Sequence, residues 1–481
     1  MLLGPENDGG PGRPSRDRLL PALLAVQARV GWVSEGALNH ICRRLGLPPA
    51  EAFGVASFYR MISLSPRAPA VAHVCEDLAC RLKGAEALCG DLERRLGAPG
   101  RDGDGRSATW QRSACLGLCD SAPAALVTRA GENPTETGLG SATAAVVLTA
   151  LESGTEAGMA APARTPIPQS GDPALRLLRR AGRINPESLA DYQAQGGFRA
   201  LELAFEMGTE GILREVTASR LHGRGGAAFP TARKWEAVAK APVHPHFLVC
   251  NADESEPGTF KDRVLLEEDP FALVEAMAIA GFATGCERGY VYIRGEYPLA
   301  AKRLEHAAVQ ARSQGLLGEN ILGSGFSFDF EIRRGGGAYI CGEETALFNS
   351  IEGYRGEPRS KPPFPTTHGL FGKPTSINNV ETLANIPDIV REGGETFSAL
   401  GTKESAGTRL FCVSGCIPRP GLYEIPMGTP LRDLLDLAGG VTAPRALRAV
   451  LLGGAAGTFL SPGELDVALS FEGTRAIGAT L

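Results

Sequence analysis

Two pairs of cysteines carry the clearest chemical signal in the sequence. Cys75 and Cys80 lie in "CEDLACRLKG", and Cys115 and Cys119 lie in "CLGLCD". Four thiolates that converge on one point suit zinc or an iron–sulfur cluster. Structural zinc sites usually have tighter spacing within each pair, whereas cysteines spread over the loops of a small α/β domain suit a [2Fe-2S] centre. The spacing favours the iron–sulfur centre.

The elements around these cysteines have to bring two turns together. "APAVAHVC" is typical of a buried strand that ends at Cys75, "GAEALCGDLERRLG" of a helix and "AALVTRAG" of a strand. The alternative is that the cysteines are small buried side chains, which is what we expect of Cys42 and Cys89. That alternative would suit one isolated pair, but it is weak for two pairs that are each bounded by glycine or a turn.

The N-terminal part of the chain resembles a known family in these same residues. Residues 19 to 130, with "GVASFY" and "CLGLCDSAPA", are similar to the 24 kDa-type subunit of respiratory NADH dehydrogenase (complex I). The resemblance implies a helical bundle followed by a thioredoxin-like domain. It also implies that the ligands of a [2Fe-2S] cluster are Cys75, Cys80, Cys115 and Cys119.

A glycine-rich stretch, "LHGRGGAAFPTARKW", runs from Leu221 to Trp235 and leads into a helical pattern. Glycines have no Cβ, so their backbone N–H groups can approach an anion closely, and the N-terminus of the following helix adds a positive dipole end. The natural ligand is a phosphate. Because most glycine-rich loops are only turns, this motif needs support from elsewhere in the sequence.

Three further polar blocks supply that support. "NADESEPGTFKDR" follows the apolar strand pattern "HFLVC" and puts carboxylates at the strand end, where α/β sheets bind their ligands. "RRGGGAYICGEETALFNSIEG" brings a second glycine cluster, and "KPPFPTTHGLFGKPTSINNVETL" brings a lysine, an aromatic residue and two amides. Such charges could also be a solvated surface, but together they favour recognition of a ring or a ribose.

The four blocks, in this order, resemble the 51 kDa-type flavin subunit of the same dehydrogenase over residues 172 to 470. The resemblance implies an FMN site, with Glu254 as the catalytic residue, and an NADH site. These types fit, because aromatic rings stack on bases, lysine binds phosphate and carboxylates bind ribose hydroxyls. The implied FMN-binding residues are Gly223, Arg224, Gly225, Lys234, Asn251, Asp253, Glu254, Gly342, Glu343, Asn378 and Asn379. The implied NADH-binding residues are Phe229, Glu256, Glu344, Lys361 and Phe364.

Two positions add detail to the implied sites. A carboxylate at Glu344, near the adenosine ribose, would repel a 2′-phosphate and so favour NADH over NADPH. Ala228 stands where the family often has glycine, which requires a backbone conformation that alanine can adopt.

The composition excludes several other classes of protein. The 481 residues are 43% hydrophobic and 21% charged, with a net charge of −5, which is ordinary for a globular protein and unlike the basic surface of a nucleic-acid-binding protein. The N-terminus lacks the apolar core of a signal peptide, and no apolar run approaches the length of a membrane span. We therefore expect no membrane span and a cytoplasmic location, either free or on the cytoplasmic face of a membrane complex.

The pattern along the chain predicts an α/β multidomain fold. We expect a disordered N-terminus over residues 1–18, a helical bundle over 19–66 and the thioredoxin-like [2Fe-2S] domain over 67–150. A linker rich in proline, glycine and serine covers 151–172. The FMN- and NADH-binding α/β domain is expected over 173–400, and a small ubiquitin-like β-grasp module, similar to SLBB domains, over 401–481.

The sequence departs from the flavin subunits after the β-grasp module. Family members continue into a helical bundle whose Cys-x2-Cys-x2-Cys motif and distant fourth cysteine bind a [4Fe-4S] cluster. Here no cysteine follows Cys416, so we expect that domain to be absent. Cys412 and Cys416 supply only two thiols, and we expect them on one face of a strand. Cys250 and Cys286 are expected in the core, and the resemblance implies that Cys341 is not a ligand.

The resemblance implies a diaphorase subunit that transfers hydride between NAD(H) and FMN and single electrons through iron–sulfur centres. The expected complex is an NAD-dependent formate dehydrogenase, a hydrogenase or an NADH:quinone oxidoreductase, and fusion of the two modules is most similar to the first two. The expected partners are NADH or NAD⁺ and the other iron–sulfur and catalytic subunits of a hetero-oligomeric redox complex. The alternative is a non-catalytic scaffold or assembly subunit without a complete electron route, which the missing cluster motif favours and the retained cysteines and flavin blocks oppose.

Overall fold

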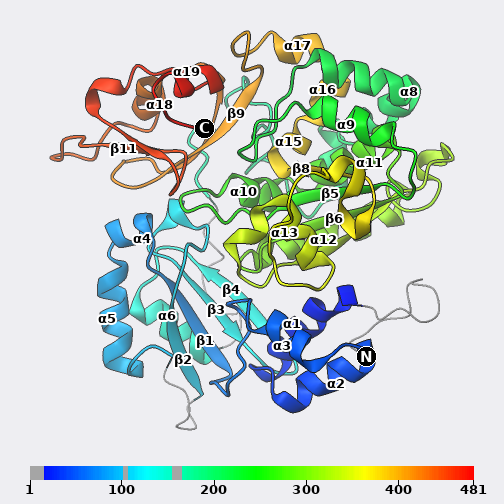
Figure 1. The fold of residues 1–481 in the computed structure, drawn as a ribbon. Coiled ribbons are helices and arrows are strands. Elements are labelled where there is room, and N and C mark those ends of the chain that lie inside the picture. Colours follow the sequence, from blue (N-terminus) through cyan, green and yellow to red (C-terminus); the bar gives the residue numbers. More distant parts are fainter. Residues whose placement is uncertain (1–15, 101–106, 154–164) are drawn as a thin grey trace. The chain divides into compact units, whose positions relative to one another are not determined.

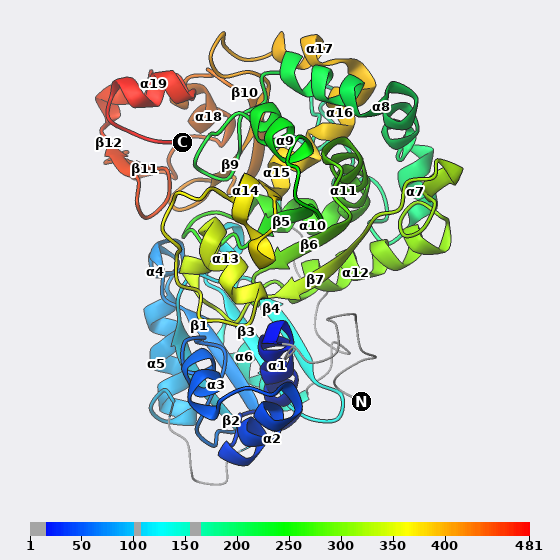
Figure 2. The same ribbon diagram turned by 45° about the vertical axis from the view of Figure 1, so that its right-hand side comes forward.

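The computed structural model describes residues 16–100, 107–153 and 165–481, which form two compact units (Figures 1 and 2). The first unit holds the described residues up to Ser153 together with Tyr292–Pro298 and Arg333–Pro362. The second unit holds Thr165–Val291, Leu299–Ile332 and Pro363–Leu481. Two segments from the middle of the sequence thus fold with the N-terminal part, which the predicted domain boundaries do not reflect.

The first unit begins with short helices that pack on one another. Leu19 and Leu23 on one side of α1 are buried, and Ser34 caps α2 by accepting a hydrogen bond from the N–H of Ala37. Arg16–Arg18, expected to be disordered, form a 3-10 turn, and residues 1–15 lie outside the described residues. The helices are η1 (Arg16–Arg18), α1 (Leu19–Val30), α2 (Glu35–Leu45) and α3 (Pro49–Ala56).

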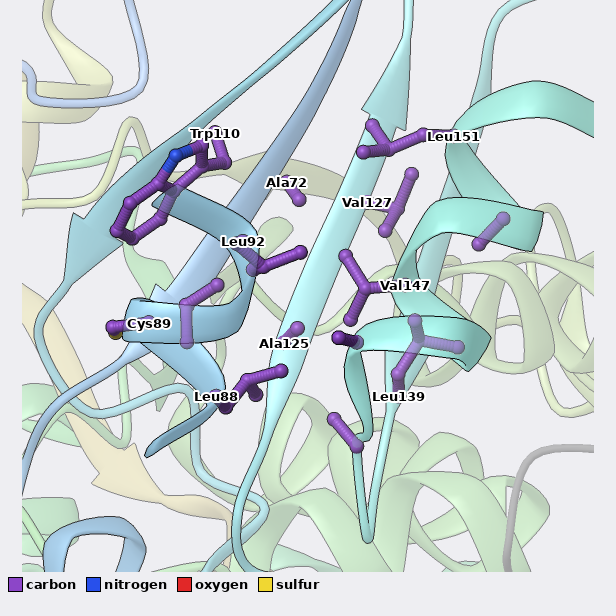
Figure 3. Packing of buried hydrophobic residues seen from close by; sticks show 14 of the residues in the cluster. Ala72, Leu88, Cys89, Leu92, Trp110, Ala125, Val127, Leu139, Val147 and Leu151 are labelled. Atoms are coloured by element: carbon purple, nitrogen blue, oxygen red, sulfur yellow. The ribbon is translucent and has the colours of Figure 1, made fainter. Parts of the chain in front are cut away.

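A four-stranded sheet in the order β2-β1-β3-β4 follows, with β1 parallel to β2 and antiparallel to β3. Leu92 from α5 and Val147 from α6 pack with Trp110 and Val127 of the sheet in one buried cluster (Figure 3). The predicted strand, helix and strand are β1, α5 and β3. The elements are β1 (Ala70–Cys75), α4 (Leu78–Leu82), α5 (Ala85–Leu96), β2 (Ala108–Ser113), η2 (Cys119–Ser121), β3 (Ala125–Arg129), β4 (Thr135–Leu139) and α6 (Ala144–Ser153).

The second unit is built on a sheet in the order β7-β6-β5-β8, in which β5 is parallel to β8. Helix α11 is apolar on nearly every side, so it is buried against β5, α8, α9, α15 and α16. None of the described helices is both long and apolar enough to cross a membrane. The strands are β5 (Phe247–Ala252), β6 (Arg288–Ile293), β7 (Asp329–Arg334) and β8 (Thr375–Asn379). The helices are α7 (Leu189–Ala194), α8 (Arg199–Ala218), α9 (Thr231–Ala239), α10 (Lys261–Glu268), α11 (Pro270–Thr284), α12 (Pro298–Ser313), α14 (Pro365–His368), α15 (Val380–Ala384), α16 (Ile386–Glu392) and α17 (Gly394–Ser398).

A smaller module with its own core follows towards the C-terminus (orange to red in Figure 1). Strands β9 and β10 pair antiparallel, and Tyr423 and Ile425 of β10 pack with Leu431 and Leu434 of α18. Strands packed on a helix are the arrangement that the β-grasp prediction required. The elements are β9 (Thr408–Val413), β10 (Gly421–Pro426), α18 (Leu431–Leu437), β11 (Val450–Leu452), β12 (Thr458–Leu460) and α19 (Phe471–Ala476).

Part of the predicted linker is packed against the second unit. Helix α6 extends to Ser153, and residues 154–164 lie outside the described residues. Thr165 is buried and accepts a hydrogen bond from Arg263 at 2.7 Å, while the N–H of Leu422 donates to the carbonyl of Pro166. The linker composition could not reveal these anchors, because their partners are far away in the sequence.

Candidate functional site

The four cysteines lie at the ends of elements of the first unit, and all four are buried. Cys75 is the last residue of β1, and Cys80 lies in the short helix α4, which Asp77 caps. Cys115 and Cys119 lie in the loop between β2 and β3. The thiols therefore come from a strand end, a short helix and one loop of the same sheet domain.

The four sulfur atoms form one cluster. Sγ of Cys115 lies 3.4 Å from Sγ of Cys119, and the Cys75 thiol makes hydrogen bonds with the thiols of Cys115 and Cys80. These hydrogen bonds, together with burial, raise the pKa of the Cys75 thiol. A set of crowded sulfur ligands fits a four-thiolate iron–sulfur centre, whose binding would displace the thiol protons.

The second site is built on the carboxyl ends of two parallel strands. β5 and β8 are in register, so that Asn251 lies opposite Asn379 and Cys250 opposite Asn378. The sequence predicted both asparagines as FMN-binding residues from blocks that are more than a hundred positions apart. The sheet brings them to one edge, where ligands of α/β sheets bind.

The glycine-rich loop closes on itself beside this edge. The N–H of Gly223 donates to the carbonyl of Phe229 at 2.9 Å, and a Cβ on Gly225 would lie 2.9 Å from Cβ of Asn379. Gly225 therefore permits a close approach that any side chain would prevent. Ala228 has φ +50, in the left-handed region, which explains why the family often has glycine there.

Helix α9 follows the loop and anchors its polar residues on β8. Lys234 donates from Nζ to the carbonyl of Ile377 at 2.7 Å, and Trp235 donates from Nε1 to Oδ1 of Asn378 at 2.9 Å. The second contact fixes the orientation of an amide that the sequence assigned to FMN. Through α9, Lys234 and Asn378 are therefore held at fixed positions near the glycine-rich loop of the second unit.

Asp253 and Glu254, which follow β5, are both buried. The Glu254 carboxylate accepts hydrogen bonds from the N–H groups of Asp262, at 2.9 Å, and Arg263, at 3.1 Å, and so caps α10 from a distant position in the loop. Burial, and after it the charge of Asp262, raises the pKa of Glu254 to about 7. A carboxyl group that titrates near neutrality at a strand end can hold or release a proton.

A buried network that sequence reasoning missed supports this site. Nζ of Lys261 lies 2.7 Å from Asp262, 3.1 Å from Oδ1 of Asn379 and 3.2 Å from Glu381. Asn379 in turn donates from Nδ2 to Asp262 at 2.6 Å. The adjacent opposite charges in "FKDR" were the available signal, but such a pair is more often a solvated surface.

The Arg224 side chain ties the glycine-rich loop to the β-grasp module. Its guanidinium is 1% exposed and donates from Nη2 to the carbonyls of Ala406, at 2.7 Å, and Thr408, at 3.0 Å. Its backbone N–H donates to Oγ1 of Thr382. The backbone N–H is thus already paired, whereas Nε and Nη1 of the buried side chain make no hydrogen bond in the structure, and the predicted FMN contact of Arg224 stays a prediction.

Two aromatic residues predicted for NADH are accessible in the second unit. Phe229 is 50% exposed and Phe364 is 58% exposed, which would leave a ring face free for stacking. Glu256 is held differently, because its carboxylate accepts hydrogen bonds from the N–H groups of Ala455 and Ala456 between β11 and β12. Its interaction with the β-grasp module could not be seen in the sequence.

The remaining predicted residues are in the first unit, where 3-10 helix η4 (Tyr339–Gly342) leads into α13 (Glu344–Ile351). The Glu343 side chain caps α13. Lys361 binds both carboxylates, at 2.9 Å from Glu343 and 2.6 Å from Glu344. Burial alone would lower the pKa of Lys361, but the hydrogen bonds to these two groups outweigh it and raise the pKa.

The other cysteines are mostly as expected. Cys250, Cys286 and Cys341 are buried, and Cys412 lies on β9, where its sulfur accepts the N–H of Phe260. The expectation that Cys416 lies on the same strand is wrong. β9 ends at Val413, and Cys416 lies in the turn beyond it, 3.0 Å from Arg445, because the glycine and proline residues there end the strand.

The cysteine cluster predicts a loss of iron that spares the flavin. Changing Cys115→Ser removes one of four sulfur ligands, so the chain should lose its [2Fe-2S] iron while FMN stays, since the glycine-rich loop and the carboxyl ends of β5 and β8 lie in the other unit. Iron analysis, EPR of the reduced protein and flavin absorbance measure this. With one four-sulfur site among the described residues, the unchanged chain should hold about two irons. Flavin loss that always accompanies iron loss would contradict the assignment.

The close approach of Gly225 predicts an effect on FMN. A Gly225→Val side chain would collide with Asn379 and fill the space where the backbone would meet a phosphate, so FMN content and NADH–ferricyanide activity should be lost. The [2Fe-2S] iron in the same preparation is the control for folding. Normal flavin content in this variant would show that the phosphate binds elsewhere.

The raised pKa of Glu254 predicts a pH-dependent stability. The native carboxyl keeps its proton up to about pH 7, whereas the unfolded carboxyl loses it near its ordinary pKa of about 4.3, so the native state loses relative stability as pH rises between these values. The free energy of unfolding of Glu254→Gln should therefore rise relative to that of the unchanged protein across this window, by up to about 4 kcal/mol. Urea unfolding of the flavin-free proteins at several pH values measures the difference. A difference that stays constant with pH would refute the raised pKa.

The sequence matches three known families. Residues 11–139 match a thioredoxin-like [2Fe-2S] ferredoxin, residues 216–388 match the Nuo51 FMN-binding domain and residues 410–456 match the SLBB domain. These matches agree with the predicted fold class and the predicted cofactors, FMN and a [2Fe-2S] cluster.

Two curated relatives align with more than half of this chain. The F 2 subunit of the NADH-quinone oxidoreductase of Rhizobium meliloti (strain 1021) is 50% identical over 307 residues, which are 63% of this chain and 73% of that protein. The HndC subunit of the NADP-reducing hydrogenase of Solidesulfovibrio fructosivorans is 50% identical over 299 residues, which are 62% of this chain and 61% of that protein.

A solved structure extends the similarity to nearly all of the chain. The match to an air-oxidized NAD⁺-reducing [NiFe]-hydrogenase has a TM-score of 0.80 and 34% identity, and covers 96% of this chain and 76% of that chain. Because the Rhizobium protein, at 50% identity, is covered over 73% of its length, the chain belongs to the family of Nuo51-type flavoprotein subunits of NADH-quinone oxidoreductase, joined here to a thioredoxin-like [2Fe-2S] domain.

Proposed function

We propose that this chain is the diaphorase subunit of an NAD-linked redox complex. It exchanges hydride between NAD(H) and FMN, and it passes single electrons to iron–sulfur centres. The observation that carries the proposal is that one chain holds both sets of residues: four converging thiols, and a glycine-rich loop packed against Asn379 at the carboxyl ends of β5 and β8. Bound FMN would supply the conversion between two-electron and one-electron transfer.

The residues of this chain would bind, orient and balance charge. Backbone amides of the glycine-rich loop and the N-terminus of α9 would bind the FMN phosphate, and the amides of Asn378 and Asn379, each fixed by a hydrogen bond, would orient the flavin. Phe229 and Phe364 would stack on NADH. Glu254, with a pKa near neutrality, would hold or release a proton after the end of β5.

The similarity to hydrogenase subunits favours a complex of that type as the partner. The relatives include an NADP-reducing hydrogenase subunit and a structure of an NAD⁺-reducing [NiFe]-hydrogenase, besides subunits of NADH-quinone oxidoreductases. Association with a formate dehydrogenase stays a prediction. A cytoplasmic location is our proposal too, supported by eleven cysteines whose clustered pairs suit metal or redox chemistry in a reducing compartment.

The rival function is a scaffold or assembly subunit that kept the fold. The purified chain separates the two possibilities, because a diaphorase subunit should show flavin absorbance and reduce ferricyanide with NADH. A colourless chain that stays inactive after reconstitution with FMN and iron would support the scaffold.

The ion pairs of Lys361 predict how Glu344 sets cofactor choice. Glu344→Ala removes a carboxylate and leaves Lys361 with one partner, Glu343, so the 2′-phosphate of NADPH should be less repelled. The ratio of kcat/KM for NADPH to that for NADH should rise, by up to about tenfold for each ~1.4 kcal/mol of relieved repulsion.

A matched control uses the same segment. Glu352, at the other end of α13, pairs with Arg359 at 2.7 Å, so Glu352→Ala also breaks an ion pair. This control should leave the NADPH to NADH ratio unchanged. A ratio that does not move in Glu344→Ala would exclude Glu344 as the specificity residue and leave Glu343 or Glu256 to be tested.

A further inference from the structure

A buried arginine outside the cysteine motifs contacts the cysteine loop. Arg294 follows β6 in the segment Tyr292–Pro298, which folds with the first unit. Its guanidinium is 3% exposed and donates from Nη2 to the carbonyl of Cys115 at 2.7 Å. It also lies over the ring of Tyr297, 4.9 Å from the centroid. A cation is therefore held at the backbone of an expected cluster ligand.

Tyr297, from the same segment as Arg294, fills a gap in the loop between Cys115 and Cys119. Gly117 has φ +69, and a Cβ there would lie 2.2 Å from the Tyr297 hydroxyl oxygen. The hydroxyl thus occupies the place of a side chain, while the N–H of Gly117 donates to Sγ of Cys115 at 3.4 Å. The loop is shaped to receive the side chains of Arg294 and Tyr297.

Glu296 places a negative charge on the same guanidinium. Its carboxylate lies 3.1 Å from Nη2 of Arg294 and accepts a hydrogen bond from Nε at 3.2 Å. Burial alone would raise the pKa of Glu296, but the charge of Arg294 and its hydrogen bond outweigh burial and lower the pKa. Both members of the pair are therefore ionised at neutral pH, and a single nitrogen of Arg294 bridges Glu296 and Cys115.

We propose that Arg294 and Glu296 are positioning residues that set the reduction potential of the [2Fe-2S] cluster with opposite signs. Reduction adds one electron to a site that already carries four thiolates, so the negative charge there increases. A desolvated cation at the Cys115 carbonyl stabilises the reduced form, and a desolvated carboxylate beside it destabilises that form. The inference rests on the cluster of the proposed function, but it concerns residues outside the cysteine motifs.

The test compares charge-removing variants in the full chain. Arg294→Gln should lower the midpoint potential and Glu296→Gln should raise it. Each variant should change the equilibrium for one-electron reduction by about tenfold, which is about 59 mV for a one-electron couple. Arg294→Lys keeps the positive charge, so its midpoint potential should stay closer to that of the unchanged protein. Redox titration followed by EPR of the reduced cluster measures all three, with iron content as the check on cluster occupancy.

A buried arginine elsewhere in the first unit supplies the structural control. Arg333 is 4% exposed and pairs with Asp17 at 2.9 Å, so Arg333→Gln breaks a comparable ion pair without touching the cysteine loop. The midpoint potential of the cluster in Arg333→Gln should not change. Shifts of opposite sign in Arg294→Gln and Glu296→Gln, with no shift in this control, would establish the proposal.

Several results would overturn the proposal. Unchanged potentials would exclude an electrostatic role, and equal shifts of one sign in all the variants would indicate general loosening of the unit. If Arg294→Gln fails to retain iron, Glu296→Gln decides: a raised potential supports the proposal and an unchanged one refutes it. An unchanged protein that binds iron but shows no binuclear EPR signal would contradict the cluster itself, which separates failure of the proposed function from failure of this inference.

Discussion

The expected flavin site depends on the ammonium group of Lys261, which is buried beside Asn379 at the end of β8. It contacts the carboxylates of Asp262 and Glu381, which are themselves almost completely buried. An isolated buried charge is costly, and removing one member of such a network leaves the others unpaired. Asn379, which binds both Lys261 and Asp262, can hold its orientation only while that balance is kept.

Two further buried cations extend the same network. Arg224 and Arg409 both interact with the charge of Glu381. Burial lowers the pKa of Arg224 to about 10, which still leaves it charged at neutral pH. The network therefore holds three cations, Lys261, Arg224 and Arg409, and two carboxylates, Asp262 and Glu381. Glu254, whose pKa is about 7, carries only part of a negative charge at neutral pH. The excess of positive charge lies where the glycine-rich loop is packed, and this would favour an anion such as the FMN phosphate.

Local patterns predicted the elements of this fold well, because each depends on neighbours in the sequence. The apolar stretch of α11, the buried strand that ends at Cys75 and the glycine-rich loop were all visible as continuous motifs. The candidate site was only partly visible. The roles of Lys261 and Arg294 depend on partners that the fold brings from more than a hundred positions away. Motif reading assigns such side chains to the solvated surface, because charged residues are rarely buried.

Buried charges also bear on the choice between a redox subunit and a scaffold. A scaffold needs only close packing, and apolar residues of similar volume usually stabilise a core as well as, or better than, a buried ion pair. This chain nevertheless buries Lys261 and Arg224 beside the expected flavin cradle, and Arg294 against the cysteine loop. In each place the charges surround a site expected to hold an anion or an electron-accepting centre. Their cost in folding is understandable if they act on a bound cofactor, and this favours the redox subunit over the scaffold.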